Sequence, residues 1–101
     1  MAEAYLIVES QITDPEAFKA YMAAAPEVVK AFGGDYLVRG GRMAVLEGDW
    51  TPPRLTLLRY PDFETAKAMY DSPAYVAARA LRQGATACFN MVLVEGVAAP
   101  V

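Results

Sequence analysis

Three of the four segments that read as β-strands are apolar on both of their alternating faces, and this pattern constrains the fold more than any other feature. In residues 4–12, Leu6 and Val8 share one face, and Tyr5 and Ile7 share the other. A strand with one face in water alternates apolar with polar residues instead. The two-sided pattern also occurs in residues 54–60 and 88–95. A sheet built from these strands needs a covering layer on each face.

Helical signals separate the strands. Asp14 can cap a helix that has Pro15 in its first turn, and the apolar residues that follow recur at steps of three and four. We expect this helix to continue, kinked at Pro26, until Gly33-Gly34. A second helical stretch has its own start and stop signals further along the chain.

That second stretch begins at the cap Asp62 and reaches Ser72-Pro73, where another cap and a first-turn proline start a new helix. The order β-α-β-β-α-β predicts an α+β, ferredoxin-like fold with a four-stranded antiparallel sheet. We expect a single domain over residues 1–101, with an ordered core of about 4–96 and a loose tail after it.

Residues 35–48 read as a strand on both sides of Gly40-Gly41. Two glycines inside such a run fit either a bulge in one long strand or a tight hairpin turn, and we favour the bulged strand. A loop that holds Trp50 then leads to the strand 54–60.

The predicted helices suffice for only one face of the sheet. The chain has 101 residues, and 55% of them are hydrophobic. A large exposed apolar patch is rare on a soluble monomer. The simplest cover for the second face is another copy of the chain, packed sheet against sheet about a two-fold axis. The pattern therefore predicts a homodimer through the sheet faces.

The charge and the N-terminal segment exclude several classes of protein. The net charge is −3 and no run of Lys and Arg occurs, so we expect no nucleic-acid partner. The N-terminal segment lacks the basic start of a signal peptide. No apolar run approaches the ~20 residues of a membrane helix. We therefore expect a cytoplasmic protein with no membrane partner.

The chain has no histidine and a single cysteine, Cys88. This excludes a Ser-His-Asp triad, a Cys-His pair, an intrachain disulfide and imidazole-ligated metals. The carboxylates lie mostly at helix starts, and no loop resembles an EF-hand. We expect no metal and no cofactor, and an apolar packing role for Cys88.

Short motifs spread over the chain give it a family resemblance. They are Asp14-Pro15-Glu16, Gly33-Gly34, Leu37-Val38-Arg39-Gly40-Gly41, Leu46-Glu47-Gly48-Asp49-Trp50, Pro53-Arg54, Tyr70, Ser72-Pro73, Tyr75, Arg82 and Leu93-Val94-Glu95-Gly96. Together they resemble the domain-of-unknown-function 1330 family, from Tyr5 to Gly96. The resemblance implies the dimeric α/β-barrel superfamily, in which two ferredoxin-like sheets close into a barrel across a two-fold axis.

The wider superfamily includes cofactor-independent monooxygenases, muconolactone isomerases and haem-dependent chlorite dismutases. The proximal ligand of haem in the last group is usually a histidine, which this chain lacks. Such diversity means that the fold alone does not identify a reaction.

Arginines are the first candidates for ligand binding. Arg39, Arg54 or Arg82 could point into a cleft between sheet and helices and bind a carboxylate of a small apolar acid. Surface solubility and salt bridges are the simpler explanation for each. For Arg82, a place near a helix C-terminus is favoured by the helix dipole alone. The run Arg39-Gly40-Gly41-Arg42 lacks the spacing of a phosphate loop, so we interpret it as strand or turn.

The other candidates are aromatic or amide side chains. Trp50 could pack in the loop or the dimer interface, or contact a ligand. Tyr70 and Tyr75 combine an apolar ring with a hydroxyl that needs a partner. Asn90 interrupts an apolar strand and would have to be hydrogen-bonded if buried, either structurally or as a donor in a pocket.

These candidates support three hypotheses of function. The first is a small homodimeric protein that binds a partly apolar, anionic molecule between sheet and helices. The second is a cofactor-independent monooxygenase or isomerase, whose base would be a buried Glu9 or Asp62, or a tyrosine. The third is a non-catalytic structural or interaction module. The sequence leaves it undecided whether the protein is an enzyme.

Overall fold

A four-stranded antiparallel sheet forms the centre of the computed structural model, which describes residues 2–98. The elements in chain order are β1 (Ala4–Ile12), α1 (Pro15–Ala31), β2 (Asp35–Arg39), β3 (Leu55–Tyr60), α2 (Phe63–Asp71), α3 (Pro73–Ala80) and β4 (Thr86–Glu95). The strands lie in the order β2-β3-β1-β4. The predicted ferredoxin-like arrangement is confirmed. The end of the predicted tail, residues 99–101, lies outside the described residues.

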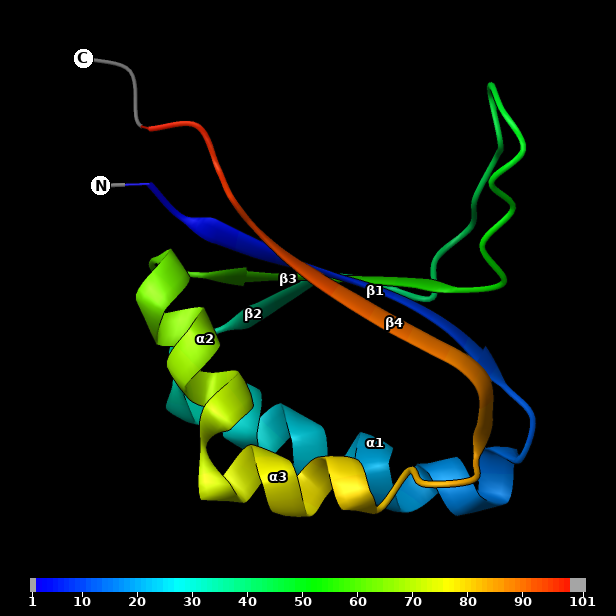
Figure 1. Cartoon of the computed structure of the whole chain (residues 1–101), viewed down its shortest axis with the longest axis horizontal. Helices are drawn as coiled ribbons and strands as arrows, with labels where there is room; N and C mark the ends of the chain where they lie inside the picture. The colour runs from blue at the N-terminus through cyan, green and yellow to red at the C-terminus, as the bar shows by residue number, and fades with distance from the viewer. Residues whose placement is uncertain (1, 99–101) are drawn as a thin grey trace.

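All three helices lie on one side of the sheet, which leaves the other face of the sheet open (Figure 1). Their starts agree with the sequence signals. The side chains of Asp14, Asp62 and Ser72 each accept a hydrogen bond from the backbone N–H of the third residue of the helix that follows. α1 continues through Pro26 as one helix. The break at Ser72 separates α2 from α3, as predicted.

The core lies between the helices and the covered face of the sheet. β1 supplies Leu6 and Val8 to it, and β3 supplies Leu58 and Tyr60. The helices add buried residues at helical spacing, which are Val29, Ala66, Met69, Tyr75 and Ala78. Burial of these side chains is the main source of stability, at roughly 25 cal/mol per Å² of apolar surface.

The predicted long strand over residues 35–48 is wrong, and so is the alternative of a tight hairpin. β2 ends at Arg39, and a register shift between Tyr36 and Val38 takes the place of the bulge expected at Gly40-Gly41. Gly40 has φ +69, a conformation that favours glycine, and its N–H donates to the carbonyl of Leu55. The chain therefore leaves the sheet after Arg39.

Residues 41–53 form a projecting segment, which we call the arm. It extends away from the helices, on the side of the open sheet face (Figure 1). Its apolar side chains are exposed, including Leu46 at 89% and Trp50 at 57%. The alternation that suggested a strand has no neighbouring strand to pair with in this segment.

We predict that Gly34→Ala destabilises the fold. A Cβ at this position would lie 2.7 Å from the Tyr60 ring and 2.8 Å from Val29 Cγ1, both in the packed core. Overpacking of this kind costs about 1–3 kcal/mol. Urea denaturation measures the free energy of unfolding, and Gly41→Ala is the matched control because only Val38 Cγ1, at 4.0 Å, is near its Cβ. Equal midpoints for the two variants would contradict the close packing at Gly34.

Candidate functional site

A cavity of about 50 Å³ lies between the covered face of the sheet and α1. Its walls are mainly apolar side chains of β1, β3, β4 and α1. Polar side chains enter it from several elements, namely Ser10, Tyr21, Tyr36, Arg39, Arg54, Thr56 and Tyr75. A cavity that is mostly apolar with a few convergent polar groups is typical of a small-molecule site.

Arg39 and Arg54 line the cavity at the sheet edge where β2 ends and β3 begins. Arg39 Nη2 donates to the carbonyl of Met22 at 3.4 Å, and its Cζ lies 4.6 Å from the Tyr36 ring centroid. Arg54 Nε lies 2.7 Å from the place of a Cβ at Gly40, so the guanidinium lies close against the backbone there. Within residues 2–98, neither arginine has a carboxylate within 4.0 Å.

Two tyrosine hydroxyls meet beside the cavity. Tyr21 of α1 and Tyr75 of α3 have hydroxyl oxygens 2.7 Å apart. Burial raises the pKa of the Tyr21 hydroxyl well above its ordinary range, and the neighbouring Tyr75 raises it further, while Arg82 partly opposes this. The Tyr21 hydroxyl therefore stays neutral at physiological pH and keeps its proton for hydrogen bonding.

Two further arginines lie over a group of neighbouring rings that we call the aromatic cluster, formed by Tyr21, Tyr70, Tyr75 and Phe89. Arg79 Cζ is 4.4 Å from the Tyr70 ring centroid, and Arg82 Cζ is 3.7 Å from that of Phe89. Arg82 also lies over Tyr21, at 5.2 Å. Neither Arg79 nor Arg82 is among the residues that line the cavity.

Glu9 brings together two of the predicted site residues on the open face of the sheet. Trp50 Nε1 donates to Glu9 Oε2 at 3.1 Å, and Asn90 Nδ2 donates to Glu9 Oε1 at 3.0 Å. Asn90 faces Glu9 across β1 and β4 and is exposed. This polar cluster is on the opposite side of the sheet from the cavity.

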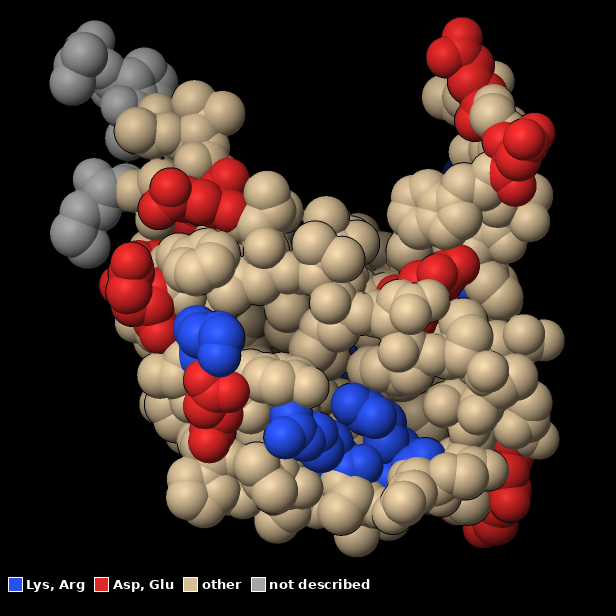
Figure 2. Space-filling view, viewed as in Figure 1, with Lys and Arg blue, Asp and Glu red and all other residues tan. Residues whose placement is uncertain are grey.

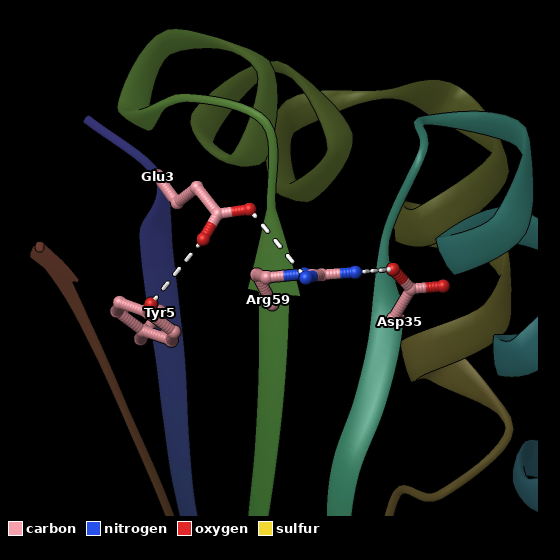
Figure 3. A network of polar contacts seen from close by, with 4 residues as sticks. All are labelled: Glu3, Tyr5, Asp35 and Arg59. Atoms are coloured by element: carbon pink, nitrogen blue, oxygen red, sulfur yellow. Dashed lines mark hydrogen bonds and ion pairs between the residues drawn. The ribbon is translucent and has the colours of Figure 1, made fainter. Parts of the chain in front are cut away.

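A second polar cluster lies at the other end of the open face. Arg59 of β3 pairs with Glu3, at 3.5 Å, and with Asp35 of β2, and the Tyr5 hydroxyl donates to Glu3 (Figure 3). These carboxylates raise the pKa of Arg59. Between the two polar clusters runs an apolar row across the four strands, formed by Val38, Leu57, Ile7 and Val92.

The structure thus divides the seven predicted site residues into three groups. Arg39, Arg54 and Tyr75 line the cavity. Tyr70 and Arg82 belong to the aromatic cluster beside it. Trp50 and Asn90 lie on the open face with Glu9.

Sequence reasoning did not select Tyr21 or Arg79. Tyr21 sits on the apolar stripe of α1, and a tyrosine there needs a partner for its hydroxyl, which is the signal that could have identified it. No pattern in the sequence identifies Arg79, because only the packing of α3 places its guanidinium group over the Tyr70 ring.

The carboxylates considered as a catalytic base do not reach the cavity. Glu9 is on the open face. Asp62 caps α2, and the hydrogen bonds that it accepts from Thr65 lower its pKa. Among the described residues, no Asp or Glu lines the cavity. Residues 2–98 also contain no cluster of three potential metal ligands and no helix long and apolar enough to span a membrane.

Comparisons with known proteins agree with this architecture. Residues 3–97 match the family model described as Domain of unknown function (DUF1330). No protein with a curated description matches the sequence. A protein of unknown function from Rhodopseudomonas palustris has a similar structure, with a TM-score of 0.73, 19% identity, and coverage of 97% of this chain and 85% of that one.

Two further solved structures share the fold. One is a dimeric ferredoxin-like protein of unknown function from Thermobifida fusca, with a TM-score of 0.63, 16% identity, and coverage of 93% of this chain and 91% of that chain. The other is a putative antibiotic biosynthesis monooxygenase from Caulobacter crescentus, with a TM-score of 0.61, 15% identity, and coverage of 95% and 91%. At such identities the likeness extends to the fold alone.

We predict that stability falls with rising pH above about 10, where an exposed tyrosine ionises. The pKa of Tyr21 is raised in the folded state, so its contribution is fully present below the pKa of the unfolded chain. It is lost progressively as the pH rises from that value towards the higher pKa of the folded chain. Each such tyrosine steepens the loss by up to about 1.4 kcal/mol per pH unit. Denaturant midpoints between pH 9 and 11 measure the slope, which Tyr21→Phe should reduce. An unchanged slope in this variant would contradict the burial of a neutral hydroxyl.

Proposed function

The chain belongs to the DUF1330 family, and we propose that it is a homodimer that binds a small, partly apolar anion in the cavity between its sheet and helices. The observation that carries the binding proposal is the pair Arg39 and Arg54 at the cavity, with no carboxylate nearby among the described residues. A guanidinium group in a partly apolar site binds a carboxylate strongly.

The cavity limits the size and the character of the ligand. A water molecule needs about 10–15 Å³ of such a volume, so about 50 Å³ accommodates only a few non-hydrogen atoms. The apolar walls favour a hydrocarbon part. Tyr21 and Tyr75 use one O–H in the hydrogen bond between them, so the other O–H is free to donate to a ligand. A short branched carboxylate combines these properties.

Binding without chemistry fits the site better than acid–base catalysis does. A proton abstraction needs a base within hydrogen-bonding reach of the substrate. Glu9 and Asp62 are held elsewhere, and a tyrosine with a raised pKa is a poor base. The monooxygenase hypothesis draws on the fold shared with the Caulobacter crescentus protein. Oxygen consumption in the presence of a bound acid would favour it.

We predict that Arg54→Met and Arg39→Met each weaken the binding of isobutyrate about tenfold or more, because a hydrogen bond to a charged group contributes about 1.5–3 kcal/mol. Isothermal titration calorimetry measures the affinity. Arg42→Met is the matched control, since Arg42 is exposed on the arm and does not line the cavity.

Isobutyramide has the same shape as isobutyrate but carries no charge. It should bind much more weakly than isobutyrate if the arginines recognise the charge of the ligand and the apolar walls do not bind it alone. The binding proposal fails if wild type takes up no small carboxylate, or if Arg54→Met and Arg42→Met bind isobutyrate equally well.

The open face of the sheet supports the homodimer. Its apolar row includes Val92, which is 59% exposed, and Val38, which is 37% exposed. The polar clusters around Glu9 and Arg59 flank this row. An apolar centre with a polar rim is the usual anatomy of an interface. The arm extends on the same side, where its exposed Leu46 could contact a second copy (Figure 1).

We predict that Val92→Asp converts the dimer to a monomer, because it places a charge in the centre of the apolar row. Sedimentation equilibrium measures the mass at micromolar concentration. Val76→Asp is the matched control, since Val76 is 45% exposed on α3, away from the sheet. A wild-type monomer, or dissociation of both variants to the same extent, would count against the interface.

A further inference from the structure

Arg79 and Arg82 lie over successive members of one run of aromatic rings. The rings follow one another with centroid distances of 5.5 Å from Tyr70 to Tyr75, 6.3 Å from Tyr75 to Tyr21 and 6.1 Å from Tyr21 to Phe89. Arg79 covers the first two rings and Arg82 covers the last two. Stacking on the rings fixes both guanidinium groups in position.

The acidic residues of the chain do not neutralise this pair. The twelve Asp and Glu residues outnumber the nine Lys and Arg residues. The ion pairs among the described residues nevertheless involve only Lys19, Arg59 and Lys67 as cations. Figure 2 shows basic side chains gathered between β4 and α3.

The carbonyl groups at the end of α3 do not neutralise the guanidinium groups of the two arginines either. The carbonyls of Ala78, Arg79 and Ala80 already accept backbone N–H groups of the turn that follows α3. One N–H nitrogen of each arginine, Arg79 Nη1 and Arg82 Nε, is buried with no acceptor among the described residues. A buried N–H group without an acceptor is costly, and an anion close to the guanidinium group would offset part of that cost.

We propose that Arg79 and Arg82 form a second anion site, separate from the cavity, for a doubly charged oxyanion of the phosphate-monoester class. The stacked faces of the guanidinium groups are occupied by rings, so the ligand meets their outer edges. Two neighbouring positive charges match the charge of about −1.5 to −2 that a phosphate monoester carries at pH 7. A planar guanidinium edge donates two parallel hydrogen bonds to phosphate oxygens.

This site does not depend on the ligand of the cavity. Arg39 and Arg54 belong to the edge formed by β2 and β3, whereas Arg79 and Arg82 follow from α3 and its C-terminal turn. Tyr21 and Tyr75 are common to both places, because their rings contact the second arginine pair and both residues line the cavity.

Titration with inorganic phosphate, and with acetate at equal ionic strength, tests the proposal by calorimetry. In Arg54→Gln, whose cavity has lost one of its arginines, we expect phosphate to bind at least about tenfold more tightly than acetate, because phosphate engages both Arg79 and Arg82. Arg82→Gln and Arg79→Gln should each weaken phosphate binding about tenfold. Arg42→Gln, which makes the same charge change on the arm, should leave it unchanged, and so should Arg54→Gln at the cavity.

Equal phosphate affinity in Arg82→Gln and Arg42→Gln would overturn the site. Acetate binding as tight as that of phosphate in Arg54→Gln, in which the cavity has lost one of its arginines, would overturn it as well. A loss of phosphate binding in Arg54→Gln would place the anion in the cavity instead.

NMR of the wild-type protein tests the same proposal without a substitution that could disturb folding. The ¹⁵N–¹H signals of Arg79 Nε and Arg82 Nε should shift together and saturably as phosphate is added, while that of Arg42 should not. Shifts that are absent, or that Arg42 shares, would overturn the proposal. Phenyl phosphate in place of phosphate then distinguishes an organic ester from the free ion as the preferred ligand.

Discussion

Helices cover only one face of the sheet, and the arrangement of charged and reactive groups follows from this one-sided packing. β1 is the central element, since it pairs with β3 on one side and with β4 on the other. Its even-numbered side chains enter the core, and its odd-numbered ones lie on the open face. Consecutive residues of β1 therefore lie on opposite faces of the sheet. Val8 and Ser10 line the cavity, while Glu9 between them holds Trp50 and Asn90.

The basic residues differ between the two sides of the sheet. On the open face, Arg59 of β3 is neutralised by Asp35 of β2 and by Glu3, which directly precedes β1 (Figure 3). Exposed pairs of this kind contribute little to stability, typically 0–1 kcal/mol. On the helix side, Arg39 and Arg82 lie over aromatic rings and have no carboxylate within 4.0 Å in the described part of the chain. Arg39 and Arg82, which belong to the two proposed anion sites, thus lie on the helix side of an acidic protein without a carboxylate partner among the described residues.

Much of the fold could be predicted because local rules govern it. Caps at Asp14, Asp62 and Ser72 and the period of the apolar residues located every helix. The same rules failed over residues 41–53, because alternation of apolar residues marks a strand only where a neighbouring strand can pair with it. Of the candidate site, Arg39, Arg54 and Tyr75 were selected for their chemistry, and the structure brings these three to one cavity. Tyr21 was missed because its importance depends on a contact 54 residues away.

The sequence by itself determined the element order, the helix starts and the presence of apolar residues on both faces of three strands. These properties depend on backbone conformation and on the two-residue period of a strand, which a linear pattern records. Only the tertiary structure decided which side chains meet. It separated Trp50 and Asn90 from the cavity and placed Arg79 and Arg82 on the rings of Tyr21, Tyr70, Tyr75 and Phe89. The physical reason is that such contacts join residues from different elements, and their distances depend on how the helices pack against the sheet.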